Sequence, residues 1–168
     1  VDSRARSCQF SSAPMNPGET SGQTGTSSST GLTSQAIAAP GILMMRALLL
    51  GERLDHRRLA VATNGTTDPL QLARPDGLIA FAFRWGAVVL VGATPEQEAE
   101  VRAELQARLS HPLVNPVEEF APIQNGAQED QVDVSGLIHL KDFSIPRLAI
   151  VADALAKSAA LTRQETIL

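Results

Sequence analysis

The pattern of hydrophobic and polar positions changes near residue 44. Before this point Ser, Thr and Gly dominate, as in Thr20–Thr30. Such a composition cannot bury enough apolar surface to offset the entropy of ordering the chain. Residues 1–43 are therefore expected to be a disordered tail or sequence upstream of a wrongly assigned start, because Met44 and Met45 directly precede the first apolar run. Residues 44–168 are predicted to form one domain.

Three apolar runs predict strands in the first half of this domain, at residues 46–50, 78–83 and 87–91. Arg84-Trp85-Gly86 joins the last two, and Gly86 can adopt the positive φ of a tight turn, so the pair is predicted to be a hairpin. Its runs are apolar on both faces. The hairpin should therefore lie in the centre of a sheet, covered on both sides or on one side and by a partner chain.

Two helices are predicted between residues 55 and 112. Residues 55–60 favour a short helix before a loop at 64–69. Thr94 and Gln97 form a capping box around Pro95 and begin a longer helix, which Pro112 is expected to close. Its sheet-facing stripe is Val101, Leu105 and Leu109.

The second half is predicted to contain strands at residues 117–123 and 131–134, joined as a hairpin by Asn125-Gly126, with 137–140 extending the second strand. A terminal helix should start near Ser144. Its predicted stripe is Leu148, Ala152, Leu155 and Ala159. This order of elements favours an α+β fold, namely a ferredoxin-like antiparallel sheet with helices on one face plus a C-terminal Ala-rich helix.

Composition narrows the functional classes. The net charge is −4, so the chain lacks the basic surface that nucleic-acid binding requires, and no nucleic-acid partner is expected. The one cysteine, Cys8, excludes an internal disulfide and a cysteine-based metal site.

No motif in the sequence predicts catalysis. The histidines, His56, His111 and His139, do not lie at metal-ligand spacing. Glu118 and Glu119 are adjacent and should point to opposite faces of a strand, so they cannot act as a carboxylate pair. No serine lies in a Gly-x-Ser-x-Gly context. We therefore expect a non-enzymatic protein without catalytic residues, cofactor or metal.

The candidate functional residues are those of an interface. Arg84 and Trp85 lie at the predicted hairpin turn, and both residue types are enriched at binding hot spots. Alternatively, Trp85 covers the edge of the core. The terminal helix carries Ala or Ser on nearly every side, which one neighbour cannot cover, so we expect it to pack on its own sheet and on another subunit. The candidate interface is Arg84, Trp85, Leu148, Ala152, Leu155, Ala156 and Ala159.

Three segments resemble the Rmd/YagE family, a group of unknown function that includes the required-for-meiotic-nuclear-division proteins. They are residues 46–55, 81–92 and 147–158, and the resemblance extends over residues 45–166. The family shows an aromatic-rich strand ending in a Tyr-Gly or Trp-Gly turn, matched here by Trp85-Gly86, and a Leu-Ala-x-x-x-Ala-Leu-Ala-x-Ser helix. Val151 stands where the family pattern has Ser.

The resemblance implies a non-enzymatic, oligomerising scaffold domain, because mitochondrial members of the family look like inner-membrane proteins that support mitochondrial translation. Members typically continue into a coiled coil and a membrane span. We accordingly expect a truncated chain that forms a homo-oligomer and whose full-length form is tethered on the cytoplasmic side of a bacterial inner membrane, with the fragment itself soluble. The alternative hypothesis is a soluble module that senses a small molecule or nucleotide.

Overall fold

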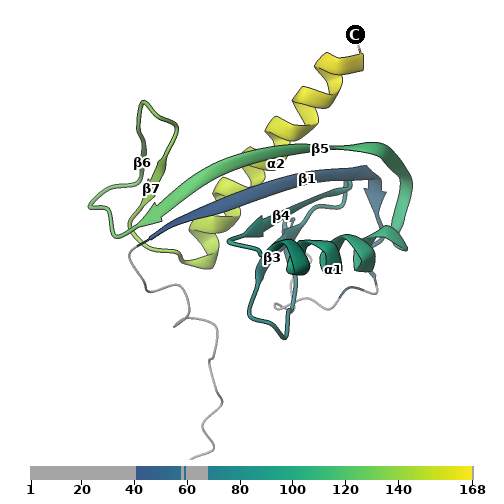
Figure 1. Ribbon diagram of the computed structural model, residues 1–168, viewed down its shortest axis with the longest axis horizontal. Coiled ribbons are helices and arrows are strands. Elements are labelled where there is room, and N and C mark those ends of the chain that lie inside the picture. Colours follow the sequence, from purple (N-terminus) through teal and green to yellow (C-terminus); the bar gives the residue numbers. More distant parts are fainter. Residues whose placement is uncertain (1–40, 58, 60–67, 168) are drawn as a thin grey trace, which may run out of the picture. The chain divides into compact units, whose positions relative to one another are not determined.

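The computed structural model describes residues 41–57, 59 and 68–167, all within one compact unit of the chain. Figure 1 shows its elements in order: β1 (Ile42–Leu54), β2 (Leu70–Gln71), β3 (Ile79–Ala82), β4 (Ala87–Val91), α1 (Pro95–Gln106), β5 (Leu109–Asn125), β6 (Gln131–Val132), β7 (Ile138–Leu140) and α2 (Ile145–Ile167). Residues 1–40 of the predicted tail lie outside the described residues. The predicted domain boundary at 44 falls inside β1, which already includes Ile42 and Leu43.

The strands form one mixed sheet in the order β2-β3-β4-β1-β5-β7-β6. β5 and β7 are parallel, whereas the other neighbouring strands are antiparallel. The predicted α+β class is therefore confirmed, but the prediction of a purely antiparallel sheet is wrong. The parallel pair arises because the chain leaves β5, turns back through β6 and then enters β7 in the direction of β5.

The sheet is covered by a helix on each face, which corrects the prediction of helices on one face. Alternate residues of β1 point to opposite sides, as the strand geometry requires. The side under α2 holds Met45, Ala47 and Leu49, together with Leu148, Ala152, Ala156 and Ala159 of the helix. The side under α1 holds Leu48, Leu50 and Leu54, together with Val101 and Leu105. Strands that are apolar at every position need cover on both sides, and this requirement separates the two helices.

The central hairpin forms as predicted. β3 pairs with β4 in antiparallel register, and every residue of both strands is buried. The Phe83 N–H donates to the Ala87 carbonyl at 2.9 Å, and Gly86 closes the turn with φ of 90°. The Leu50 N–H also donates to the Gly86 carbonyl at 3.0 Å, so this turn lies directly against β1.

The second half of the domain differs most from the sequence prediction. α1 ends at Gln106, and Pro112 belongs to β5, a strand of 17 residues. Asn125-Gly126 does not form a hairpin, because β5 pairs with β1 and β7 rather than with β6. The hairpin in this region joins β6 to β7 instead, and Gly136 has φ of 85°. Proline is tolerated in β5 because β7 pairs only with its last three residues, which leaves most of β5 at an edge of the described sheet.

Two further predictions concern helices. The described residues Asp55, His56 and Arg57 of the predicted helix at 55–60 belong to no helix, and Arg58 and Ala60 lie outside the described ranges, as do residues 64–67 of the predicted loop. The capping box of Thr94 and Gln97 forms as predicted, and α2 begins at Ile145 with Pro146 in its first turn. Neither described helix combines the length and apolarity that crossing a bilayer requires.

Replacing Gly86 with Ala tests the close approach of the hairpin turn to β1. A Cβ atom at Gly86 would lie 2.2 Å from the Gly51 carbonyl oxygen, and the residue has φ of +90°. Gly126 is a matched control, since it has φ of +85° but no atom within 4 Å of such a Cβ. We expect Gly126→Ala to lower the free energy of unfolding by about 1–2 kcal/mol through backbone strain alone. Gly86→Ala should cost about 1–3 kcal/mol more because the backbone must shift.

Urea denaturation of both variants provides the measurement. Equal losses of stability would show that the turn does not approach β1 as closely as described.

Candidate functional site

Four charged side chains tie α1 to the sheet. Arg46 of β1 lies between Glu98 of α1 and Glu118 of β5, with 2.5 Å between its Nη2 and the Glu118 Oε2; it also donates to Glu98. Arg102 of α1 contacts the same two carboxylates, at 2.9 Å from its Nε to Glu98 Oε1 and 2.6 Å from its Nη2 to Glu118 Oε1. Each carboxylate therefore meets two guanidinium groups. We call these four residues the charge cluster.

The charge cluster holds Glu118 in its ionised form. The hydrogen bond from Arg46 lowers the pKa of Glu118 and, with that from Arg102, outweighs partial burial, which acts to raise the pKa. Glu119 points to the other face, where its Oε1 accepts a hydrogen bond from the Thr162 hydroxyl of α2 at 2.8 Å. The predicted opposite orientation of the two glutamates is therefore confirmed. Both carboxylates fasten a helix to the sheet, one on each face.

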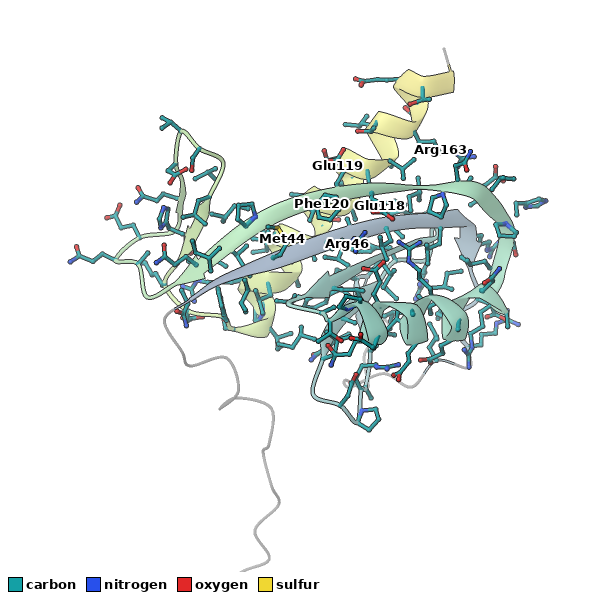
Figure 2. All side chains as sticks on the ribbon, in the orientation of Figure 1. Met44, Arg46, Glu118, Glu119, Phe120 and Arg163 are labelled. Carbon is teal, nitrogen blue, oxygen red and sulfur yellow. The ribbon has the colours of Figure 1, made fainter. Side chains whose placement is uncertain are left out.

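A group of apolar side chains lies exposed beside the charge cluster (Figure 2). Arg46 points to the α1 side of the sheet. Met44, two residues before it on β1, points to the same side, and so does Phe120, which pairs with Arg46 on β5. The Arg46 guanidinium carbon is 4.9 Å from the centre of the Phe120 ring, a cation–π distance. Phe120 nevertheless keeps 52% of its surface accessible, and Ile42 is also exposed. We call Ile42, Met44 and Phe120 the sheet-face patch.

A second exposed apolar surface lies on α2. Ile150 and Leu161 are 71% and 60% exposed, and Ala154 and Lys157 between them are exposed as well. These residues are separated by four, three and four positions, so they form one stripe along the helix. We call them the outer face of α2. Lys157 Nζ contacts Asp153 Oδ2, beside the stripe, at 2.6 Å.

The predicted interface residues of the terminal helix lie on its opposite side. Leu148, Ala152, Ala156 and Ala159 have no exposed surface, and Leu155 is partly buried against the same core. These side chains contact the sheet of their own chain, where alanine allows α2 to approach β1 and β5 closely. The predicted packing of these residues on their own sheet is therefore observed, and contact of the terminal helix with another subunit stays a prediction. Ile150 and Leu161 were missed, although their spacing opposite the alanine stripe was visible in the sequence.

The two hairpin residues occupy an intermediate position. Trp85 is partly buried against the core under α2, and its ring centre is 5.3 Å from that of Phe83 with the planes tilted by 47°. The Arg84 carbonyl accepts a hydrogen bond from the Leu54 N–H at 2.8 Å. The structure therefore places Trp85 over its own core, and a partner contact at Arg84 and Trp85 stays a prediction.

Polar residues also gather at the turn of the β6–β7 hairpin. Asp133 accepts hydrogen bonds from the Ser135 hydroxyl at 2.6 Å and from the Leu137 N–H at 3.1 Å, and its Oδ2 lies 3.2 Å from His139 Nε2. The hydrogen bonds from Ser135 and His139 lower the pKa of Asp133 from 3.8 to about 2. The Ser135 N–H also donates to Asp133 Oδ1 at 2.8 Å, so the carboxylate gathers the donors of this loop and stabilises the turn. The described residues hold no group of three metal-ligating side chains.

One open depression lies at the C-terminal end of α1. It has a volume of about 590 Å³, and its lining includes Asp55, Arg57, Arg108 and Ser110. The two guanidinium groups could attract an anionic ligand.

In comparisons with known proteins, no family model, curated protein or solved structure matches the chain. The resemblance to the Rmd/YagE family therefore stays a prediction, and the surfaces described above carry the functional argument.

Replacing Glu98 with Gln tests the charge cluster. Glu98 is buried, and the change leaves two arginines sharing one carboxylate. We expect the free energy of unfolding to fall by about 1–3 kcal/mol, as for hydrogen bonds to charged groups. Glu100→Gln is the control on the same helix, because Glu100 is 68% exposed and contacts Arg74 at 3.3 Å. It should cost less than about 0.5 kcal/mol.

Chemical denaturation at neutral pH measures both values. The cluster would have no stabilising role if the two variants lost the same stability.

Proposed function

We propose that the chain is a non-enzymatic scaffold domain that associates with a second copy of itself through the outer face of α2. The observation that carries this proposal is that α2 is apolar on two opposite sides. One side is buried against the sheet, whereas the other exposes Ile150 and Leu161. Ile150 and Leu161 lie on one exposed face of the helix together with Ala154 and the alkyl stem of Lys157, which makes this face a candidate interaction surface.

Association through the edge of the sheet is less favourable. A new strand needs free backbone N–H groups on the edge strand, and β5 contains Pro112, Pro116 and Pro122, which have none. The charged side chains of Glu118 and Glu119 also lie along this strand. These features protect the edge of β5 against strand addition, so a helix surface is the better site for self-association.

The family resemblance extends the proposal. It implies a scaffold that is tethered to a membrane and organises other macromolecules. The mitochondrial members of the family look like inner-membrane proteins that support translation in this way. The ferredoxin-like arrangement belongs to the same proposal. In its support, β3, β4, β1 and β5 lie in this order and are antiparallel, as in that fold.

Light scattering across a concentration series tests self-association. The chain has a mass of 17.8 kDa, and we expect the average mass to rise toward twice that value at tens of micromolar. Exposed apolar residues supply the driving force, so added salt should not reverse the rise. A constant monomer mass over this range would contradict the proposed function.

The depression beside Arg57 and Arg108 favours one alternative function, the sensing of a small anionic molecule such as a nucleotide. ATP is a suitable probe for a thermal-shift experiment. At 100 times its dissociation constant, a ligand of the folded state adds about 2.7 kcal/mol of stability. The Arg57→Gln variant should lose this shift. An unchanged melting temperature at millimolar ATP would contradict nucleotide sensing.

A further inference from the structure

The exposed residues on the outer face of α2 have a spacing that is the same from either end of the helix. Ile150, Ala154, Lys157 and Leu161 are separated by four, three and four residues. This is the spacing of the a and d positions in a coiled-coil seam. The large apolar residues stand at the two ends, and Ala154 and Lys157 lie between them. A second copy of the helix can therefore align with the first in reversed direction and match all four positions.

From this symmetry we infer that two copies pair through α2 in antiparallel orientation, about a two-fold axis that passes between Ala154 and Lys157. This inference rests on the proposed function and specifies its geometry. Ile150 meets the partner's Leu161, and Lys157 lies over the partner's Ala154. The contact is isologous, since the same residues of both copies form it, so the assembly closes as a dimer.

The charges of α2 favour the antiparallel over the parallel orientation. In a parallel pair the same positions face each other, and the two Lys157 ammonium groups would meet in the seam, where like charges repel. In the antiparallel pair each Lys157 passes over a small Ala154 instead. Asp153 precedes Ala154, so the partner's Asp153 lies beside this lysine. Lys157 already contacts its own Asp153 at 2.6 Å, and it can share the two carboxylates across the interface.

The sheet leaves this surface accessible. The residues that attach α2 to the sheet, among them Leu148, Ala152 and Ala156, have no exposed surface and lie on the opposite side of the helix. Figure 1 shows the last turns of α2 extending past β5. Pairing through the outer face therefore requires no rearrangement of the core.

The extent of the seam indicates a weak dimer. Ile150 and Leu161 are about 16 Å apart along a helix that rises 1.5 Å per residue. A helix pair of three turns is small compared with standard interfaces of about 1,200–2,000 Å². We accordingly expect a dissociation constant in the micromolar range, which is sensitive to a single charge in the seam.

Disulfide trapping tests the orientation. The 168-residue chain with Cys8→Ser serves as the background, which removes the native cysteine. We expect a mixture of the Ala154→Cys and Lys157→Cys variants to form a mixed disulfide dimer under mild oxidation, because these positions face each other. Each variant alone should give several-fold less dimer. Efficient cross-linking of Ala154→Cys with itself would instead indicate a parallel pair and overturn the inference.

Charge substitution tests the surface itself. Ile150→Glu should raise the dissociation constant at least tenfold, measured by sedimentation equilibrium, while circular dichroism confirms that the fold is unchanged. Met44→Glu is the matched control, since it places the same charge on the exposed sheet-face patch, and it should change the constant less than twofold.

The outcomes separate the inference from the proposed function. A wild-type chain that stays monomeric overturns both. A wild-type dimer that Ile150→Glu does not weaken overturns the inference alone, and the scaffold would then associate through another surface. A stronger effect of Met44→Glu than of Ile150→Glu would place the contact on the sheet-face patch and equally contradict the inference.

Discussion

The structure depends on burying both faces of β1 at once. This strand pairs with β4 on one side and β5 on the other, and its alternate residues contribute to two separate cores. A strand apolar at successive positions from Ala47 to Leu50 cannot leave either face in water without a large loss of hydrophobic stabilisation. One helix therefore covers each face of the sheet, α2 on one side and α1 on the other.

The two helices are attached by different physics. Val101 and Leu105 are the apolar residues that α1 buries against the sheet. The charge cluster adds ionic hydrogen bonds between α1 and strands β1 and β5. α2 is attached by close packing instead, because Ala152, Ala156 and Ala159 let its backbone approach the sheet. At its start, Arg147 contacts Asp130 at 2.9 Å and Asp142 at 2.6 Å, which orients the first turn.

This mode of attachment has a functional consequence. α2 contacts its sheet through alanines on one side, so the opposite side of the helix remains at the surface. On that face the chain carries Ile150 and Leu161, which are exposed and do not belong to the core of their own chain. The glutamates and the Asp133–Ser135–His139 group, by contrast, are engaged in holding helices and a turn. The scaffold proposal follows from this division between side chains that stabilise the domain and side chains left exposed.

Local patterns in the sequence determined the central hairpin at Gly86, the capping box of Thr94, the start of α2 and the opposite orientation of Glu118 and Glu119. Each depends on residues close together in the chain, through backbone conformation or strand periodicity. Only the tertiary structure decided that the helices lie on opposite faces, that β5 passes through its prolines along an edge, and which side of α2 remains exposed. These features depend on contacts between residues far apart in sequence. An alanine-rich helix does not specify by itself which side meets the sheet, because several of its sides could pack there.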